Sequence, residues 1–185
     1  MTVREAGREI LTELDRSLAA IEESQADHLV QALMSAERVF VVGVGRVMLS
    51  LRAFAKRLNH IGIPAWCVGD TNEPAAQPGD LLVVGSGSGE SVIPVAIARV
   101  AHEIGVQIVH IGSSPSSSMA SYSSAFVRIP VRTRLGLPQE IDSIQPMTSL
   151  FEQALYLFCD AVCLTIVKRK GVDVPSLWET HANLE

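Results

Sequence analysis

The chain has 185 residues, of which 48% are hydrophobic and 19% are charged, and its formal net charge is −5 at pH 7. This length and apolar content fit one folded domain and exclude an intrinsically disordered chain. The acidic balance argues against a nucleic-acid-binding surface. The longest apolar stretch, 154–167, has about 14 residues and contains Asp160, so it is shorter than the roughly 20 residues that span a membrane.

The N-terminus and the cysteines predict a cytoplasmic protein. The first residues, MTVREAGREIL, are charged and amphipathic, and they lack the apolar core of a signal peptide. The three cysteines, Cys67, Cys159 and Cys163, cannot all pair with one another, and no C-x-x-C motif occurs. We therefore expect reduced, buried thiols.

Taken in chain order, helical and strand patterns alternate. Leucine and isoleucine at three- and four-residue spacing predict a helix over 3–24, and a second short helix is expected over 26–36. Runs of apolar, largely β-branched residues then predict five strands, at 38–43, 65–68, 80–85, 107–111 and 124–129. Further helices are expected at 47–61, 92–104 and 146–170, and a short tail helix from Pro175.

Strands that alternate with helices of about a dozen residues predict an α/β fold. We expect a three-layer αβα sandwich around a doubly wound, five-stranded parallel sheet, with an N-terminal helical arm. One domain should cover 1–185, divided into N-terminal helices (1–36), a sheet core (37–145), and C-terminal helices and tail (146–185). The ligand site of such a fold lies at the carboxyl ends of the strands. The loops expected there are 43–47, 69–73, 85–91, 112–118 and 130–133.

The loop Gly85-Ser-Gly-Ser-Gly-Glu-Ser91, hereafter the serine loop, has the composition of an anion site. Alternating glycines let backbone N–H groups turn toward one point, and the helix behind the loop contributes its positive N-terminal end. Ser86, Ser88 and Ser91 add hydroxyl donors. The loop is not a P-loop, because no Gly-Lys-Ser/Thr follows. A merely flexible connection is the alternative, but flexibility does not explain so regular an alternation.

Other residues near strand ends carry weaker signals. The turn 43–46 either brings Arg46 to an anion or leaves it as a surface arginine at a helix start. We do not expect nicotinamide binding, because position 48 is Met where a dinucleotide fingerprint has its third glycine. Glu152 either complements the dipole of the long helix or faces a pocket. Metal-ligand spacing is absent among four histidines that we expect to be structural or solvated: His28, His60, His102 and His110.

Several motifs together resemble the SIS (sugar isomerase) domains that bind phosphosugars, and within them the 6-phospho-3-hexuloisomerase family. The segment 86–91 is typical of the whole superfamily. Gln145-Pro-Met-Thr-Ser-Leu-Phe-Glu152 and the ending His181-Ala-Asn-Leu-Glu185 are much more specific. Weaker parts of the match lie at 43–46, 52–58 and 69–75, so the resemblance covers nearly the whole chain.

The resemblance implies an isomerase that interconverts 3-hexulose 6-phosphate and fructose 6-phosphate without a metal or cofactor. The reaction belongs to the ribulose monophosphate pathway, which fixes or releases formaldehyde. The resemblance also implies a homotetramer whose partner is a small phosphosugar, with no nucleic acid or membrane involved. Carried onto this chain, it implies Glu152 and His181 as catalytic residues. The implied substrate-binding residues are Gly45, Arg46, Arg52, Ser86, Ser88, Gly89 and Ser91.

The implied reaction moves a carbonyl from C3 to C2, so a proton leaves C2 and another returns at C3 through an enediol. A carboxylate in apolar surroundings can serve as the base, and Glu152 lies among Leu150, Phe151 and Leu155. Histidine titrates in the range that a proton shuttle needs, and His181 can act in its own or in a neighbouring subunit. The apolar stripe of the first helix and the apolar final helix also indicate subunit packing.

Two positions depart from the family pattern. Val47 stands where the family usually has Ser, and Glu73 stands where it has Thr. Two alternatives therefore stay open. One is an isomerase for another sugar phosphate, such as a pentose 5-phosphate. The other is a non-catalytic phosphosugar sensor, although we expect a sensor to carry a DNA-binding domain that 1–185 does not contain.

Overall fold

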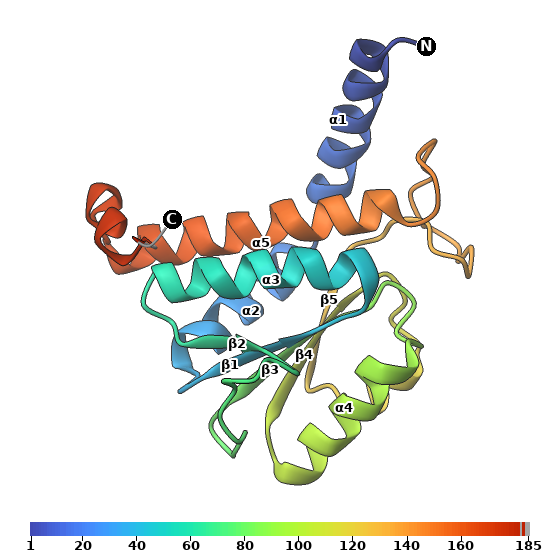
Figure 1. The fold of residues 1–185 in the computed structure, drawn as a ribbon. Helices are drawn as coiled ribbons and strands as arrows, with labels where there is room; N and C mark the ends of the chain where they lie inside the picture. The colour runs from blue at the N-terminus through green and yellow to red at the C-terminus, as the bar shows by residue number, and fades with distance from the viewer. Residues whose placement is uncertain (182, 184–185) are drawn as a thin grey trace.

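The computed structural model describes residues 1–181 and 183, and its centre is one parallel sheet (Figure 1). The strands are β1 (Val39–Val42), β2 (Ala65–Cys67), β3 (Leu81–Gly85), β4 (Gln107–Gly112) and β5 (Ala125–Arg128). Their order is β2-β1-β3-β4-β5, and all four neighbouring pairs are parallel. The chain thus winds outward in both directions from β1 and β3, which confirms the predicted doubly wound α/β class.

Helices cover both faces of the sheet. They are α1 (Val3–Ala19), α2 (Glu23–Ser35), α3 (Gly45–His60), α4 (Val92–Ile104) and α5 (Ser149–Lys170), with short 3₁₀ helices η1 (Ser118–Ser121) and η2 (Val174–Thr180). The first layer contains α2, α3 and α5, α4 lies on the opposite face, and α1 projects away from the body (Figure 1). The three predicted layers and the N-terminal helical arm are therefore present.

Alternate residues of each strand enter different layers, because side chains along a strand point to opposite faces. Val39 and Val41 belong to the larger core under α2, α3 and α5, whereas Phe40 belongs to the smaller core under α4. The register repeats this division in β3, since Val39 pairs with Leu81 and Phe40 with Leu82. Burial on both faces explains why the strands read as continuous apolar runs.

Several predicted element boundaries were wrong. The first helix ends at Ala19 and α2 starts at Glu23, because the chain turns at 20–22 while Ile21 still packs against the core. The apolar stripe therefore continues across a break that spacing alone does not reveal. The long helix begins at Ser149, not at 146, since Met147 has a left-handed φ of 56°. The tail helix is a 3₁₀ helix.

By length and composition alone, α5 is apolar enough to cross a membrane. In this fold it is a core helix instead, because Phe151, Leu155 and Phe158 are buried against the other layers. Cys159 and Cys163 lie on its buried side as free thiols. Burial raises the pKa of Cys163 to about 12, so this thiol stays protonated. The helix thus belongs to the interior of a soluble fold.

Candidate active site

A cavity of about 650 Å³, hereafter the active-site cavity, opens at the carboxyl ends of β1 and β3. This is the point at which the strand order switches, the usual ligand position in an open α/β sheet. Residues from four segments line the cavity: 44–47 after β1, 85–92 around the serine loop, 133–135 after β5, and 146–152 at the start of α5. Segments far apart in the sequence therefore converge on one site.

The serine loop presents its hydroxyl groups to this cavity. The Ser86 and Ser91 Oγ atoms are 3.1 Å apart, and Ser86 Oγ accepts a hydrogen bond from the Gly89 N–H at 3.1 Å. Ser88 Oγ accepts from the Glu90 N–H at 3.2 Å. These internal bonds fix the shape of the loop. Because each hydroxyl both donates and accepts, bonding capacity is left for a ligand.

Three helix N-termini point at the active-site cavity. The residues before α3, α4 and α5 are Val44, Ser91 and Thr148, and within the described chain none of their side chains caps the helix that follows. All three residues line the cavity. First-turn N–H groups without partners carry partial positive charge. Together with the hydroxyls, they make this end of the sheet an anion site.

Gly85 allows α3 to lie directly against the end of β3. A Cβ atom at this position would lie 2.8 Å from Val47 Cγ1 and 2.9 Å from Leu51 Cδ1. Any larger residue would therefore push α3 away from the serine loop. The same contact shows where Val47 points: its methyl groups fill the space beside the two glycines at 43 and 85, and the cavity wall there is apolar.

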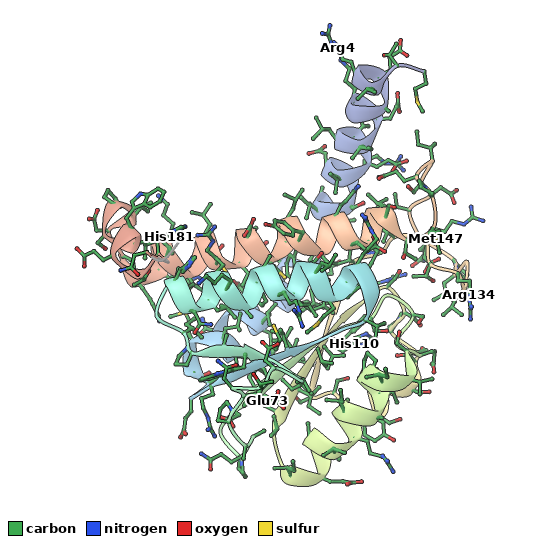
Figure 2. The ribbon with its side chains drawn as sticks, viewed as in Figure 1. Arg4, Glu73, His110, Arg134, Met147 and His181 are labelled. Atoms are coloured by element: carbon green, nitrogen blue, oxygen red, sulfur yellow. The ribbon has the colours of Figure 1, made fainter. Side chains whose placement is uncertain are left out.

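His110 supports the serine loop from the sheet (Figure 2). It lies on β4 with 1% of its surface exposed, and its Nε2 is 2.9 Å from the Ser86 carbonyl oxygen. A carbonyl only accepts, so Nε2 carries the hydrogen. Burial lowers the pKa of His110, and the bond to Ser86 opposes this in part. His110 is thus structural, one of the two alternatives expected from the sequence, and it holds the loop in place.

Glu152 faces the active-site cavity from the first turn of α5, and only 11% of its side chain is exposed. Its carboxylate accepts hydrogen bonds from Arg46 Nε and, at 3.0 Å, from Thr148 Oγ1. The Ser50 hydroxyl bonds to its backbone carbonyl at 3.0 Å, which ties α3 to α5. Glu152 therefore faces a pocket, one of the two positions that the sequence left open.

Comparisons with known proteins identify the family. A model of the SIS domain family matches residues 32–157. The 3-hexulose-6-phosphate isomerase of Bacillus subtilis is 37% identical over the full length of both chains, and that of Mycobacterium gastri is 37% identical over 94% of this chain and 86% of its own. The chain belongs to the SIS domain family. Within it, the chain belongs with the 3-hexulose-6-phosphate isomerases, as its motifs predicted.

A solved structure agrees with this assignment. The crystal structure of a Methanococcus jannaschii protein, from which a function of 3-hexulose-6-phosphate isomerase was inferred, is similar to this SIS domain with a TM-score of 0.84. The two chains are 26% identical, with 98% of this chain and 99% of the other covered. The relatives confirm an isomerase as the class of enzyme.

Not every residue predicted for the site lines the active-site cavity of this SIS domain. Gly45, Arg46 and the three loop serines do. Gly89 is buried within the serine loop and does not line the cavity. Arg52 lies outside the cavity, because its place on α3 turns its Nη2 toward Asp70 Oδ1, 3.6 Å away. The structure therefore gives Arg52 no contact with a ligand in this cavity.

His181 lies at the opposite end of the SIS domain from Glu152. Its ring packs against those of His60 and Trp178, with centroids 5.6 and 5.4 Å apart. His60 ends α3 while Arg46 lies in its first turn, so about 20 Å of helix separates His181 from the cavity. Figure 2 shows His181 and Met147 at opposite ends of α5. Three further residues of the terminal motif, 182, 184 and 185, lie outside the described residues.

Sequence reasoning missed two polar residues of the cavity wall. Thr148 precedes α5 and holds Glu152, and Arg134 follows β5. The expected loop 130–133 stopped one residue short of Arg134, although polar residues at a strand's carboxyl end were a usable signal. The expected loop 69–73 does not line this cavity. The loop 112–118 supports the serine loop instead, since the Ser113 N–H donates to the Gly87 carbonyl at 2.8 Å.

In residues 1–181 and 183, no group of three or more His, Cys, Asp or Glu is placed to hold a metal ion.

Proposed function

We propose that this protein interconverts 3-hexulose 6-phosphate and fructose 6-phosphate without a metal or cofactor, in the ribulose monophosphate pathway. One observation carries the proposal: the same cavity joins an anion site to an almost buried carboxylate that other groups hold in place. The relatives that are 37% identical bear the name of this activity. A sugar phosphate needs both features, one for its phosphoryl group and one for its reacting carbons.

The phosphoryl group binds at the serine loop. Ser86, Ser88 and Ser91 donate hydroxyl hydrogens, and the first turns of α3 and α4 supply N–H groups. This phosphoryl site lies away from the carbons that react. The binding energy of the phosphoryl group can therefore orient the substrate and lower the barrier of the proton transfer.

Glu152 removes the proton from C2. Arg46 and Thr148 hold its carboxylate in one orientation, and a positioned base contributes roughly 10²–10⁴-fold to a rate. The enediolate that forms carries negative charge on oxygen. The Arg46 guanidinium lies beside the base, where it stabilises this charge as it develops. Glu152 then returns a proton at C3.

His181 shuttles the proton between the two substrate oxygens, and it comes from a neighbouring copy of the chain. Within one chain, a helix length separates it from Glu152. The helices α3 and α5 run in the same direction (Figure 1). A second copy, related by a two-fold axis and packed antiparallel against this helix pair, therefore brings the C-terminal ends of its own α3 and α5 to the N-terminal ends of the first pair. Each copy would then complete the site of the other.

The outer face of α3 and α5 suits this packing. A groove of about 400 Å³ lies next to Glu152, lined mainly by Leu14, Leu49, Tyr156 and Leu157. Leu49 is 65% exposed and Leu11, on the projecting α1, is 66% exposed. Exposed apolar surface of this kind marks an interaction site. We therefore propose a homo-oligomer, and we expect a tetramer because the family that the motifs resemble forms tetramers. We also propose a cytoplasmic location, which fits the free thiols.

The test is incubation with 3-hexulose 6-phosphate, generated in place by a synthase, while fructose 6-phosphate is followed. Formation of fructose 6-phosphate faster than in the absence of this protein supports the proposal. No increase over that background rate contradicts it.

A different sugar phosphate is the second candidate, because Val47 gives the cavity an apolar wall where the family usually has a hydroxyl. Glu73 no longer favours it, since its carboxylate accepts from the Gly69 N–H at 2.8 Å and it lines another groove. A panel of pentose and hexose phosphates separates the two. A sensor would bind fructose 6-phosphate without exchanging any of its carbon-bound hydrogens.

A further inference from the structure

The charges around the serine loop do not balance a phosphoryl group. A phosphate monoester carries about −1.5 to −2 at pH 7, whereas the loop residues 85–91 include no cation. Glu90 adds a further carboxylate at the cavity rim, where it binds the N–H and hydroxyl of Ser118. The Arg46 guanidinium is engaged by Glu152. The hydroxyls and helix N-termini supply only partial positive charge, so a cation from another segment would complement the phosphoryl group.

Arg134 is the other arginine that lines the cavity. It is exposed, and within residues 1–181 and 183 its guanidinium has no carboxylate partner. The residue before it, Thr133, is buried and lies directly beside the serine loop, because a Cβ atom on Gly87 would lie 3.4 Å from Thr133 Cγ2. Arg134 therefore lies at the rim of the cavity, next to the serine loop.

Glu140 holds the segment that carries Arg134. Its carboxylate accepts hydrogen bonds from the Thr133 N–H at 3.2 Å, the Thr133 hydroxyl at 3.0 Å, the Leu137 N–H at 2.9 Å and the Ser113 hydroxyl at 3.0 Å. A bridge between Val131 and Ile141 closes the base of the segment. The loop is thus folded around its own glutamate, and the backbone position of Arg134 is set.

We propose that Arg134 is a substrate-binding residue that pairs with the phosphoryl group, and that Glu140 is the positioning residue that keeps it there. This inference rests on the proposed phosphosugar function and adds to it the cation that the serine loop lacks. The planar guanidinium matches two phosphoryl oxygens at once. The cavity then selects a phosphate monoester over the free sugar.

The test compares Arg134→Ala with Arg132→Ala in the full chain. Arg132 is a matched control, because it lies two residues away, is exposed, and pairs with Asp142 at 2.9 Å outside the cavity. We expect R134A to weaken fructose 6-phosphate binding and raise KM by roughly 10- to 100-fold, with kcat little changed. R134K should recover part of the loss, and R132A should match the wild type. Wild-type affinity in R134A would overturn the proposal.

Glu140 is tested through its coupling to Arg134. E140Q should raise KM with little effect on kcat in the wild-type background, and should add little in the R134A background, because the two residues act as one unit. An equal KM increase in both backgrounds would show that Glu140 does not act through Arg134. Thermal unfolding of each variant separates this effect from a general loss of stability.

Calorimetric binding of fructose 6-phosphate keeps this inference separate from the proposed reaction. If the wild type binds but does not isomerise and R134A binds more weakly, the proposed reaction fails and the role of Arg134 stands. If the wild type isomerises and R134A binds as tightly, the reaction stands and the role of Arg134 fails.

Discussion

The two ends of the α3–α5 helix pair carry different chemistry. At the N-terminal end, Glu152 and Arg46 meet in a cavity with hydroxyls and uncapped helix N-termini. At the C-terminal end, His181 packs against His60, the last residue of α3. Each end holds one half of the proposed acid–base pair, a helix length apart. Under the proposed mechanism, the base and the histidine of one chain therefore serve different copies of the site.

The largest effect is expected at the N-terminal end. Glu152→Gln keeps the shape of the side chain and one acceptor oxygen but removes its basicity, so kcat should fall by about 10²–10⁴-fold. Binding of fructose 6-phosphate should stay close to wild type, since the serine loop is untouched. A coupled assay and calorimetry measure the two quantities. Substantial residual turnover would remove Glu152 from the mechanism.

A smaller loss is expected at the C-terminal end. His181→Ala should lower kcat by about 10²-fold and affect binding less. Because the two ends are assigned to different copies, mixing and reassembling E152Q with H181A should restore activity well above either variant alone. Each variant reassembled with itself is the control. No recovery of activity in the mixture would mean that Glu152 and His181 of one chain act in the same site. That result would contradict the assignment of the two helix ends to different copies.

Ser88 tests the phosphate-binding part of the N-terminal end separately from its base. Ser88→Ala removes one hydroxyl from the anion site, so KM should rise by roughly 3- to 10-fold while kcat stays near wild type. The matched control is Ser176→Ala, whose hydroxyl bonds to the Asp173 carbonyl in the tail at 2.7 Å. Steady-state kinetics distinguish the two variants. A fall in kcat without a change in KM in S88A would contradict a role in phosphate binding.

The smallest effect concerns acid stability at the histidine end. Burial, and then the charges of Lys56, Arg57 and His181, lower the pKa of His60 from its ordinary 6.5. The folded chain therefore binds this proton less well than the unfolded chain, and stability is lost as the pH falls below about 6.5. His60→Gln should reduce the drop in Tm between about pH 7.5 and 5.5 by a few degrees at most. His110 has a lowered pKa that acts in the same direction in both proteins. A drop in Tm that is as large in H60Q as in the wild type would contradict the prediction for His60.

The sheet and the serine loop were predictable because their signals are local. Val39 to Val42 and Leu81 to Gly85 read as buried strands, and the glycine and serine alternation marks the loop wherever the rest of the chain lies. Glu152 was predictable as a candidate only, because its direction depends on Arg46 and Thr148, which approach from a different helix and from the preceding turn.

The remainder depends on contacts that no local pattern encodes. Arg134 reaches the cavity because Glu140 folds its loop through bonds that include Ser113, 27 residues away. Arg52 misses the cavity by its position around α3, where Asp70 engages it. The distance between His181 and Glu152 follows from where the tail packs after α5, and the sequence leaves that packing open.

Hydrogen exchange at C3 of fructose 6-phosphate in D₂O tests the central claim most directly. Loss of that hydrogen gives the 2,3-enediol and is the reverse of the last proton transfer assigned to Glu152. We expect the wild-type protein to introduce deuterium at C3, and E152Q to bind the sugar without doing so. Deuterium at C3 in E152Q at the wild-type rate, or deuterium only at C1 in the wild type, would contradict the account.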